Sequence, residues 1–447
     1  MALVLTTTTT SASAQLEFFT RPDHGQDQLY IKQANSQVYR ALPNDAFTAQ
    51  RLGHVPGQSV SSLDDATLRS MNLTLAPDPV PTLLPNYNIP DDIMAKELQR
   101  IHLLSCSWPI FYFKNLGLLQ NPALARDWAR NVSILSYRGA RWVDVNNYFV
   151  ELDDNSTQIV ARPKFQLGDK DSKYGALGWV EDIRLLPHPD PANGTVFLSY
   201  TQITKMTHPL PQGHMSLSIM ALDRSANKYE VLPSTRDKGW RLDWAEKLKH
   251  VGHLPSVEKN WSPFIAPGGE LHFVYSYHPF RVLAVDRFTS VWNETQREPD
   301  NTAHVSLVSE MRCLNTWEYG QIRGGTPALI VRGEFLTFFH SRTRLKGSKF
   351  ETYFMGALTF SAMPPHRLLR QSRVPILVDE FYTGPWAGMR TIDYIVFPLG
   401  FFVHDDGNSI TLSLGQNDKQ GFIVKMHVDA LFASLLPLNC SNNDNRF

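Results

Sequence analysis

Four short polar signatures beside predicted hairpins hold the residues of this chain whose types and spacing could do chemistry. The first, Glu181-Asp182-Ile183-Arg184, sets two carboxyl groups beside a guanidinium. Such an ion pair can keep one acid ionised while a neighbouring acid retains its proton. A protonated carboxyl is what cleavage of a glycosidic bond needs, because the departing oxygen must receive a proton. The motif therefore suits acid–base chemistry on a sugar, with a surface salt bridge as the alternative.

The next two signatures offer groups that bind sugars and phosphates. Glu258-Lys259-Asn260-Trp261 places an acid, a cation, an amide and an aromatic ring in four consecutive positions. Sugars are held by hydrogen bonds and by stacking on a ring face, whereas Lys and Arg grip phosphate. Arg323-Gly324-Gly325-Thr326 adds an arginine and two glycines that let the backbone approach a ligand closely. Packing of Trp261 at a strand edge is the alternative for the first of these two motifs.

The remaining candidates stand at the far ends of hairpins. Tyr275 and His278 end the hairpin that begins at Asn260, and His340 ends the next one, although a lone histidine is more commonly structural than catalytic. Gly415-Gln416-Asn417-Asp418 offers amides and a carboxylate to sugar hydroxyls, with a plain turn as the alternative. The sequence contains no Walker or dinucleotide-binding fingerprint, no G-x-S-x-G elbow and no zinc-protease helix.

Strands separated by Gly, Asn and Asp turns must position these residues. The hairpins that carry the signatures are residues Val180 to Tyr200, Asn260 to Ser276, Gly324 to Ser341 and Tyr394 to Leu414, and a weaker copy spans Asn131 to Arg138. Five units of roughly 50 to 80 residues, each with room for about four strands, predict an all-β, five-bladed propeller over residues 131–435. A β-sandwich is the competing fold. A propeller would bring the polar signatures to one shared cavity.

The rest of the chain is predicted to be less regular. Residues 1–90 are rich in Thr, Ser, Pro and Gln and are interpreted as a low-complexity or wrapping arm. Helical spacing over Ile93–Leu104, and a shorter helix over Ala123–Arg130 opened by Asn121-Pro122, make residues 91–130 a helical lead-in. Residues 436–447 are predicted to be a disordered tail. The 3 cysteines are widely separated and predict free thiols, with neither a disulfide framework nor a zinc site.

Composition narrows the partners. The 43 basic residues balance 43 acidic ones, which argues against nucleic acid or a polybasic membrane surface as the main partner. The longest apolar run, Tyr394–Val403, is too short to span a membrane and contains Pro398 and Gly400. The N-terminus lacks the basic start and apolar core of a signal peptide, whereas seven Asn-x-Ser/Thr sequons keep a secretory route open. The cytoplasm is favoured, and the oligomeric state is left open.

At these motifs the chain resembles the five-bladed propeller enzymes of glycoside hydrolase family 130 and the related β-mannosyltransferases, whose wider relatives include the furanosidase propellers. The resemblance spans residues 128–435. The family's Glu-Asp-Pro-Arg signature looks like Glu181–Arg184, with Ile183 in place of proline. Its other motifs look like Asn131–Arg138 for the first hairpin, Glu258-Lys259 for the phosphate site, Gly324–His340 for the Gly-rich segment, and Val396–Gly400 and Gly415–Asp418 for the final hairpin.

The resemblance implies inversion at a mannosyl anomeric carbon. By this resemblance Asp182 is the acid or base, and Arg184 and Lys259 contact an anion or a sugar. Asp418 binds a hydroxyl of the substrate, and Arg138 and Arg323 complete a positively charged rim. Because the family's basic phosphate cluster is only partly visible, a glycosyltransferase is predicted. It would use a phosphate-activated sugar donor, such as a nucleotide-sugar or sugar phosphate, and an oligosaccharide or glycan acceptor, with no metal and no other cofactor. A hydrolase, a phosphorylase and a non-catalytic glycan-binding propeller are the alternatives.

Overall fold

The computed structural model describes three strands near the N-terminus and most of residues 110–440. The N-terminal strands are β1 (Leu16–Arg21), β2 (Gln28–Gln33) and β3 (Tyr39–Leu42), which pair in order as one antiparallel sheet. Within 110–440, the residues left out are 118, 129, 140–146, 153–164, 168–178, 191, 206–211, 224–227, 232–238, 253–256, 294–297, 313–316, 344–351, 377–380, 382–394, 419 and 439. The sequence predicted no strand in the N-terminal arm, and the helix predicted over Ile93–Leu104 lies outside the described residues.

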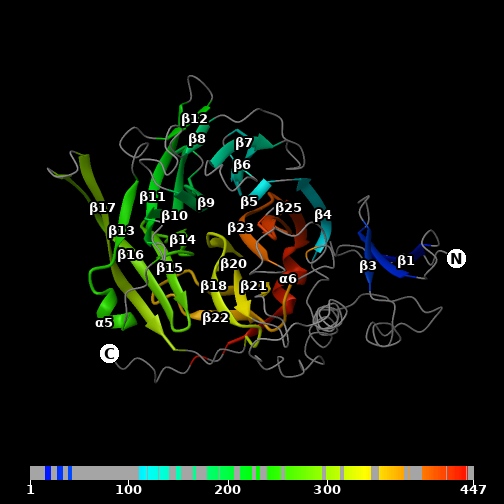
Figure 1. Ribbon diagram of the computed structural model, residues 1–447. Helices are drawn as coiled ribbons and strands as arrows, with labels where there is room; N and C mark the ends of the chain where they lie inside the picture. The colour runs from blue at the N-terminus through cyan, green and yellow to red at the C-terminus, as the bar shows by residue number, and fades with distance from the viewer. Residues whose placement is uncertain are drawn as a thin grey trace, which may run out of the picture.

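The described part of the chain is mainly β, and its strands form five successive antiparallel units (Figure 1). The first unit consists of β5 (Leu119–Asp127), β6 (Val132–Gly139), β7 (Asn147–Leu152) and β8 (Phe165–Leu167). The second consists of β9 (Trp179–Pro187), β10 (Thr195–Lys205) and β11 (Gln212–Asp223), with β12 (Lys228–Val231) and β13 (Trp240–Asp243) both paired with β11. The third consists of β14 (Ser262–Ile265), β15 (Leu271–Tyr277), β16 (Phe280–Asn293) and β17 (Glu298–Met311). A short parallel pairing of β13 with β17 joins the second and third units.

Each of the last two units includes one strand that is distant in the sequence from the others. The fourth consists of β18 (Gln321–Gly324) and β19 (Leu329–Val331), both paired with β20 (Glu334–Thr343), followed by β21 (Thr352–Ser361), β22 (Leu368–Ser372) and the late strand β26 (Leu435–Pro437). The fifth consists of β23 (Val396–Val403), β24 (Ser409–Gln416), β25 (Gln420–His427) and the early strand β4 (Ile110–Gly117). The pairing of β4 with β25 therefore places the beginning and the end of residues 110–440 in one sheet.

The four predicted hairpins are confirmed as β9–β10, β14–β15, β19–β20 and β23–β24. The weaker copy at Asn131–Arg138 contains β6, which is the second strand of the first unit, so this unit begins one strand earlier than predicted. The helix predicted over Ala123–Arg130 is wrong, because most of this segment belongs to β5. All of β5 from Gln120 onward is buried, between β9 on one side and β23 and β24 on the other. Burial on both faces overrides the helical spacing.

The tail predicted at residues 436–447 is also more ordered at its start than expected. Its first two residues complete β26, and Cys440 is disulfide-bonded to a cysteine outside the described residues, which corrects the prediction of three free thiols. The helix α6 (Val428–Ser434) precedes β26 and buries Val428, Leu431 and Phe432 against the fourth and fifth units. In the described part of the chain, no helix is long and apolar enough to cross a membrane.

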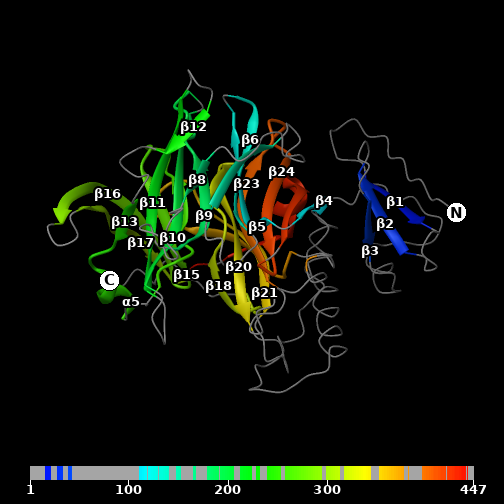
Figure 2. The same ribbon diagram turned by 45° about the horizontal axis from the view of Figure 1, so that its top comes forward.

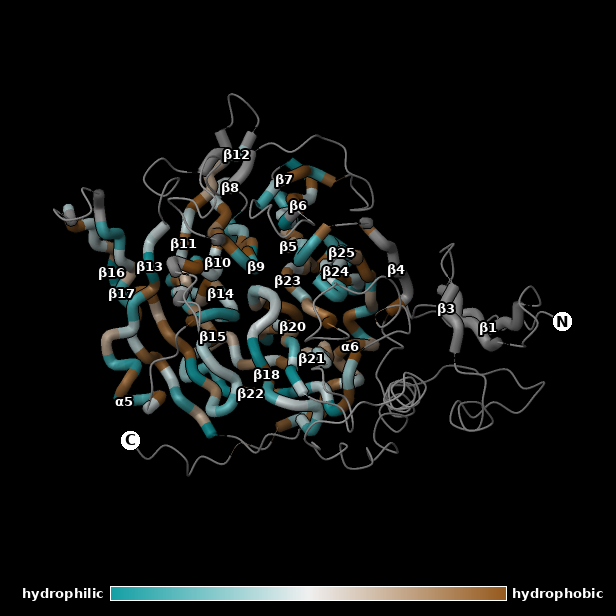
Figure 3. The backbone as a smooth tube through the Cα atoms, in the orientation of Figure 1, coloured by the Kyte–Doolittle hydropathy of each residue, from teal (hydrophilic) through white to brown (hydrophobic). Residues whose placement is uncertain are grey.

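The first strands of the five units lie toward the middle of the molecule (Figure 1). There β5 contacts β9 and β23, and β9 in turn contacts β14. Hydrophobic residues concentrate between the units (Figure 3), where the largest cluster joins the third, fourth and fifth units and includes Phe264, Phe335 and Phe360. The long strands β16 and β17 extend beyond the others at one side (Figure 2).

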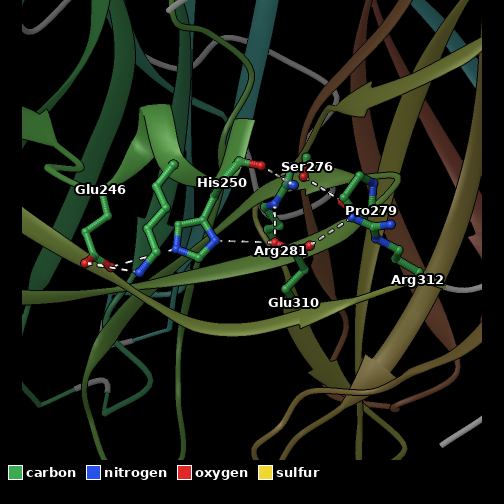
Figure 4. A network of polar contacts seen from close by, with 8 residues as sticks. Glu246, His250, Ser276, Pro279, Arg281, Glu310 and Arg312 are labelled. Carbon is green, nitrogen blue, oxygen red and sulfur yellow. Dashed lines mark hydrogen bonds and ion pairs between the residues drawn. The ribbon is translucent and has the colours of Figure 1, made fainter. Parts of the chain in front are cut away.

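A polar network fastens the short helix α5 (Lys247–Val251) to the third unit (Figure 4). The Arg281 guanidinium is its centre. Nε of Arg281 lies 2.8 Å from Oε2 of Glu310, and Nη2 donates to the His250 carbonyl at 2.8 Å. The His250 ring stacks on Trp244, with ring centroids 5.3 Å apart. The helix has no buried residue of its own, and polar contacts to Arg281 and the stacking of His250 on Trp244 help to hold it.

Candidate active site

Five residues of the candidate site and its surroundings have left-handed backbone conformations. Asn121, Asp182 and Asn260 have φ of 46°, 56° and 66°, and the adjacent Asn417 and Asp418 have 51° and 49°. Asn and Asp tolerate this region better than other non-glycine residues, but it is still uncommon. At Asn121 and Asp182 the strand pairing also shifts register, as in a β-bulge. Bulges and strained backbone gather near functional sites, where they re-aim side chains.

Arg184 connects three of the units beneath these residues. Its side chain is fully buried, and its nitrogens donate to the carbonyls of Asp182 at 2.7 Å and Gly325 at 2.6 Å and to Oδ1 of Asn260 at 3.0 Å. Burial lowers the pKa of Arg184 to about 10, while the charge of Asp182 acts in the opposite direction. The anion or sugar contact expected of Arg184 is not what the structure shows, because its guanidinium points into the protein.

Three carboxyl groups, Glu181, Asp182 and Asp418, form what we call the carboxylate cluster. Nδ2 of Asn121 donates to Oδ1 of Asp182 at 2.8 Å, and Nη1 of Arg138 lies 3.5 Å from Oε1 of Glu181. The three carboxyl groups of the cluster come from the second and fifth units, and their partners Asn121 and Arg138 come from the first. Two of its predicted members, Asp182 and Asp418, are thus brought together from positions more than two hundred residues apart in the sequence.

Burial raises the pKa of Glu181, and the neighbouring charge of Asp182 adds to the effect, whereas Arg138 and Lys259 lower it. Burial likewise raises the pKa of Asp418, opposed first by Arg138. Desolvation and like charges both disfavour the ionised form of a carboxyl. Glu181 and Asp418 therefore keep a proton at higher pH than an exposed carboxyl does, and the neighbouring cations limit the rise.

A cationic side lies next to the carboxylate cluster. Lys259 is exposed, and Arg323 stands opposite His340 in the pairing of β18 with β20. The His340 ring is 1% exposed and stacks on Tyr353, and its Nδ1 has no hydrogen-bond partner among the described residues. Burial holds the pKa of His340 well below its ordinary value, and the charges of Arg323, Arg184 and Lys259 lower it further. The buried imidazole therefore stays neutral to lower pH than an exposed histidine does.

Several predicted site residues have structural contacts instead. Glu258 pairs with Lys247, whose Nζ lies 2.7 Å from Oε1, and accepts a hydrogen bond from Nε1 of Trp261 at 3.1 Å. Trp261 is 1% exposed and packs against Phe273 and Tyr275, so it has no free ring face for a sugar. The packing alternative for Trp261 is the one that the structure supports.

Tyr275 and the two glycines of the third signature also serve packing. Tyr275 lies edge-on to Trp244 and Trp261, and burial raises its pKa. A Cβ at Gly324 would overlap the Asn260 carbonyl, and one at Gly325 would overlap the Phe338 carbonyl. The glycines therefore let strands approach each other, where the sequence suggested the approach of a ligand. His278 is exposed in the turn before β16.

Sequence reasoning missed Gln120 and Asn121 at the start of β5. Oε1 of Gln120 accepts a hydrogen bond from Nε of Arg138 at 2.9 Å, and its Nε2 donates to the Asp418 carbonyl. The Asn121-Pro122 pair was interpreted as a helix start, and only the left-handed Asn preference could have suggested a bulge. Among the residues that the structure describes, no group of three or more His, Cys, Asp and Glu side chains could hold a metal ion.

No protein-family model matches the sequence, and no curated protein matches it significantly. Among solved structures, the chain is similar to a mannose phosphorylase from Leishmania mexicana in complex with phosphate, at 8% identity and a TM-score of 0.47, over 78% of this chain and 97% of that one. A GDP-Man-dependent mannosyltransferase from the same organism is 11% identical, with a TM-score of 0.43, over 76% and 96%. A glycosyl hydrolase from Bacteroides ovatus is 16% identical, with a TM-score of 0.43, over 72% and 87%. At these values the activity must be argued from the chain's own residues.

Proposed function

We propose that the chain is a five-bladed β-propeller that transfers a sugar from a phosphate-activated donor to a hydroxyl of an oligosaccharide or glycan, with inversion and a β-mannoside-like product. Five antiparallel units with inward first strands support this architecture, because a propeller gathers those strands round one channel. The observation that carries the function is the meeting of the carboxylate cluster with Arg138 and Lys259, whose charges act on the same two acids.

Asp182 is the proposed catalytic residue. Its carboxylate accepts the proton of the acceptor hydroxyl as that oxygen bonds to the anomeric carbon, while the bond from this carbon to the phosphate oxygen breaks on the opposite face. Lys259 and Arg323 stabilise the charge that develops on the departing phosphate. Glu181 and Asp418 accept hydrogen bonds from sugar hydroxyls when ionised.

A phosphorylase or hydrolase on the same scaffold is the second candidate. The raised pKa values of Glu181 and Asp418 favour it, because an acid that keeps its proton to higher pH than usual is better suited to protonate a departing sugar oxygen. In that reaction inorganic phosphate or water attacks the anomeric carbon as the glycosidic bond breaks.

Product analysis separates the candidates. The protein is incubated with a β-manno-oligosaccharide alone, with inorganic phosphate, and with mannose 1-phosphate or GDP-mannose. Extension of the oligosaccharide with release of phosphate or nucleotide supports transfer. Mannose 1-phosphate formed only with phosphate indicates phosphorolysis, and free mannose formed without it indicates hydrolysis. An oligosaccharide that binds but never changes would identify a glycan-binding protein.

Asp182→Asn should lower turnover on the order of 100- to 10,000-fold, as expected for a lost general acid or base. The matched control is Asp190→Asn, an exposed position in the turn of the same hairpin, which should keep wild-type turnover. Normal turnover by Asp182→Asn would show that the catalytic assignment is wrong.

A further inference from the structure

Asn121 lies where the first, second and fifth units meet, and the chemistry proposed above gives it no task. Its Nδ2 donates to Oδ1 of Asp182 at 2.8 Å. A side-chain hydrogen bond from Asn121 also lowers the pKa of Asp418, against the effect of burial. One amide therefore serves two carboxyl groups of the carboxylate cluster.

The orientation of this amide is fixed by its surroundings. Asn121 is 9% exposed and sits in the bulge of β5 with φ of 46°. Its Oδ1 is buried without a hydrogen-bond partner among the described residues and faces Gly415, where an added Cβ would lie 2.5 Å away. A flipped amide would turn that oxygen toward carboxylate oxygens, which repel it, so the N–H₂ group must face the acids.

Gln120 completes the arrangement. Its side-chain amide links the Arg138 side chain, which donates to the amide oxygen, to the Asp418 carbonyl, which accepts from the amide nitrogen. The turn that carries Asp418 is held separately, because Oδ1 of Asn417 accepts a hydrogen bond from the Ile395 amide at 2.9 Å. The backbone at Asp418 is therefore held by two contacts, one to Gln120 and one between Asn417 and Ile395.

We propose that Asn121 is a positioning residue, whose side-chain amide holds the Asp182 carboxyl in one fixed orientation beside Asp418. A donated hydrogen bond favours the ionised form of a carboxyl, and two like charges at close range favour retention of one proton by the pair. Loss of this donor should therefore make ionisation of the two carboxyl groups harder. The role in catalysis rests on the proposed function, whereas the effect on the two acids does not.

The test uses three variants and one control in the full chain. Asn121→Gly removes the amide but keeps a residue that accepts positive φ, and Asn121→Asp keeps the shape but exchanges the donor for an acceptor. Gly415→Ala leaves Asn121 in place and pushes its amide aside. The control is Asn131→Gly, which also replaces a left-handed Asn, with φ of 56°, at an exposed turn.

The first readout is ¹³C NMR of protein labelled at the aspartate carboxyl carbons, titrated without substrate. Signals are assigned by their loss in Asp182→Asn and Asp418→Asn. In Asn121→Gly and Gly415→Ala the titration of the pair should move to higher pH, and in Asn121→Asp further still, whereas Asn131→Gly should match the wild type. This measurement needs no turnover, so it decides the inference even if the wild type acts on none of the mannosyl substrates and the proposed function fails.

The second readout is turnover of whichever mannosyl substrate the wild type uses. Asn121→Gly should lower kcat on the order of 100-fold, as expected for a misplaced catalytic group, with KM little changed and the pH optimum moved upward. Midpoints of Asp182 and Asp418 that equal those of the control overturn the proposal. A loss of thermal stability with unchanged midpoints overturns it as well, because Asn121 would then be structural only.

Discussion

Arg184 shows how a single buried residue can hold the backbone at Asp182, the proposed catalytic residue. Its guanidinium donates to the carbonyl of Asp182, the residue whose left-handed backbone aims the carboxyl into the site. Through Nη2 it also reaches Oδ1 of Asn260 and the carbonyl of Gly324. A buried guanidinium is tolerated when acceptors surround it, and these acceptors come from three different units.

Arg184→Met should lower the free energy of unfolding by about 3 kcal/mol or more, because several buried acceptors lose their donor together. Arg184→Lys should lower the free energy of unfolding less than Arg184→Met does, because an ammonium can still donate to some of the acceptors. It should not match the wild type, because an ammonium cannot reach all the acceptors at once. Urea unfolding measures both. Arg312→Met is the control, because its side chain is 71% exposed and surface changes stay within about 0.5 kcal/mol. An Arg184→Met protein as stable as this control would show that the guanidinium is not a brace.

The sequence indicated which charged residues lie close together, but it did not indicate which candidate side chains are buried by their neighbours. Asp182, Asp418, Arg138 and Lys259 meet in one place, as their positions at hairpin ends suggested. Trp261 does not join them, because whether an aromatic ring faces a ligand or the core depends on neighbours such as Phe273, which are unknown until the strands are packed. Asn121 was missed for the same reason, since its role depends on two acids that lie far away in the chain.

At the scale of elements, the strands that carry turn signals were predictable and those defined by a partner were not. The hairpins β9–β10 and β23–β24 are bounded by Gly, Asn and Asp turns that fix them locally. In contrast, β4 forms only against β25, and β26 only against β22. β5 has helical spacing in its sequence but lies between other strands. Local pattern cannot reveal such pairings, because the partner lies outside any sequence window.

The short helix α5 offers a test of how its network holds it. Arg281→Met removes the donor to the His250 carbonyl and the partner of Glu310 (Figure 4). A hydrogen bond made by a charged donor contributes about 1.5–3 kcal/mol, so amide hydrogen exchange in α5 should become about 10- to 100-fold faster. Hydrogen-exchange mass spectrometry over residues 247–252 measures this. Glu246→Gln should have little effect, because Glu246 is 63% exposed and its contacts are 3.8 Å or longer.

At the scale of the whole molecule, buried histidines set the response to acid. Burial lowers the pKa values of His340, His366, His404 and His427. As pH falls through the ordinary histidine value of 6.5, the unfolded chain takes up protons that the folded chain cannot, so stability falls. Glu181 and Asp418 act in the opposite sense, because their raised pKa values let the folded chain take up protons first.

The melting temperature should therefore decline as pH is lowered from about 7.5 toward 5.5, where the histidine effect begins. His366→Asn should flatten this decline, since Asn does not titrate and tolerates the φ of 55° at this position. Differential scanning calorimetry at several pH values compares the two proteins. A wild-type melting temperature that rises over this interval would mean that the two acids outweigh the histidines.

The pairing of β4 with β25 has a consequence for synthesis on the ribosome. Gly117 of β4 pairs with Gly421 of β25, so one strand of the fifth unit is made long before the other three. At about 5 to 20 residues per second, β25 leaves the ribosome roughly 15 to 60 s after β4. Throughout that interval β4 has an unpaired backbone edge of the kind that recruits other chains. The strands β2 and β3 also contact β4 in the folded chain and are made before it.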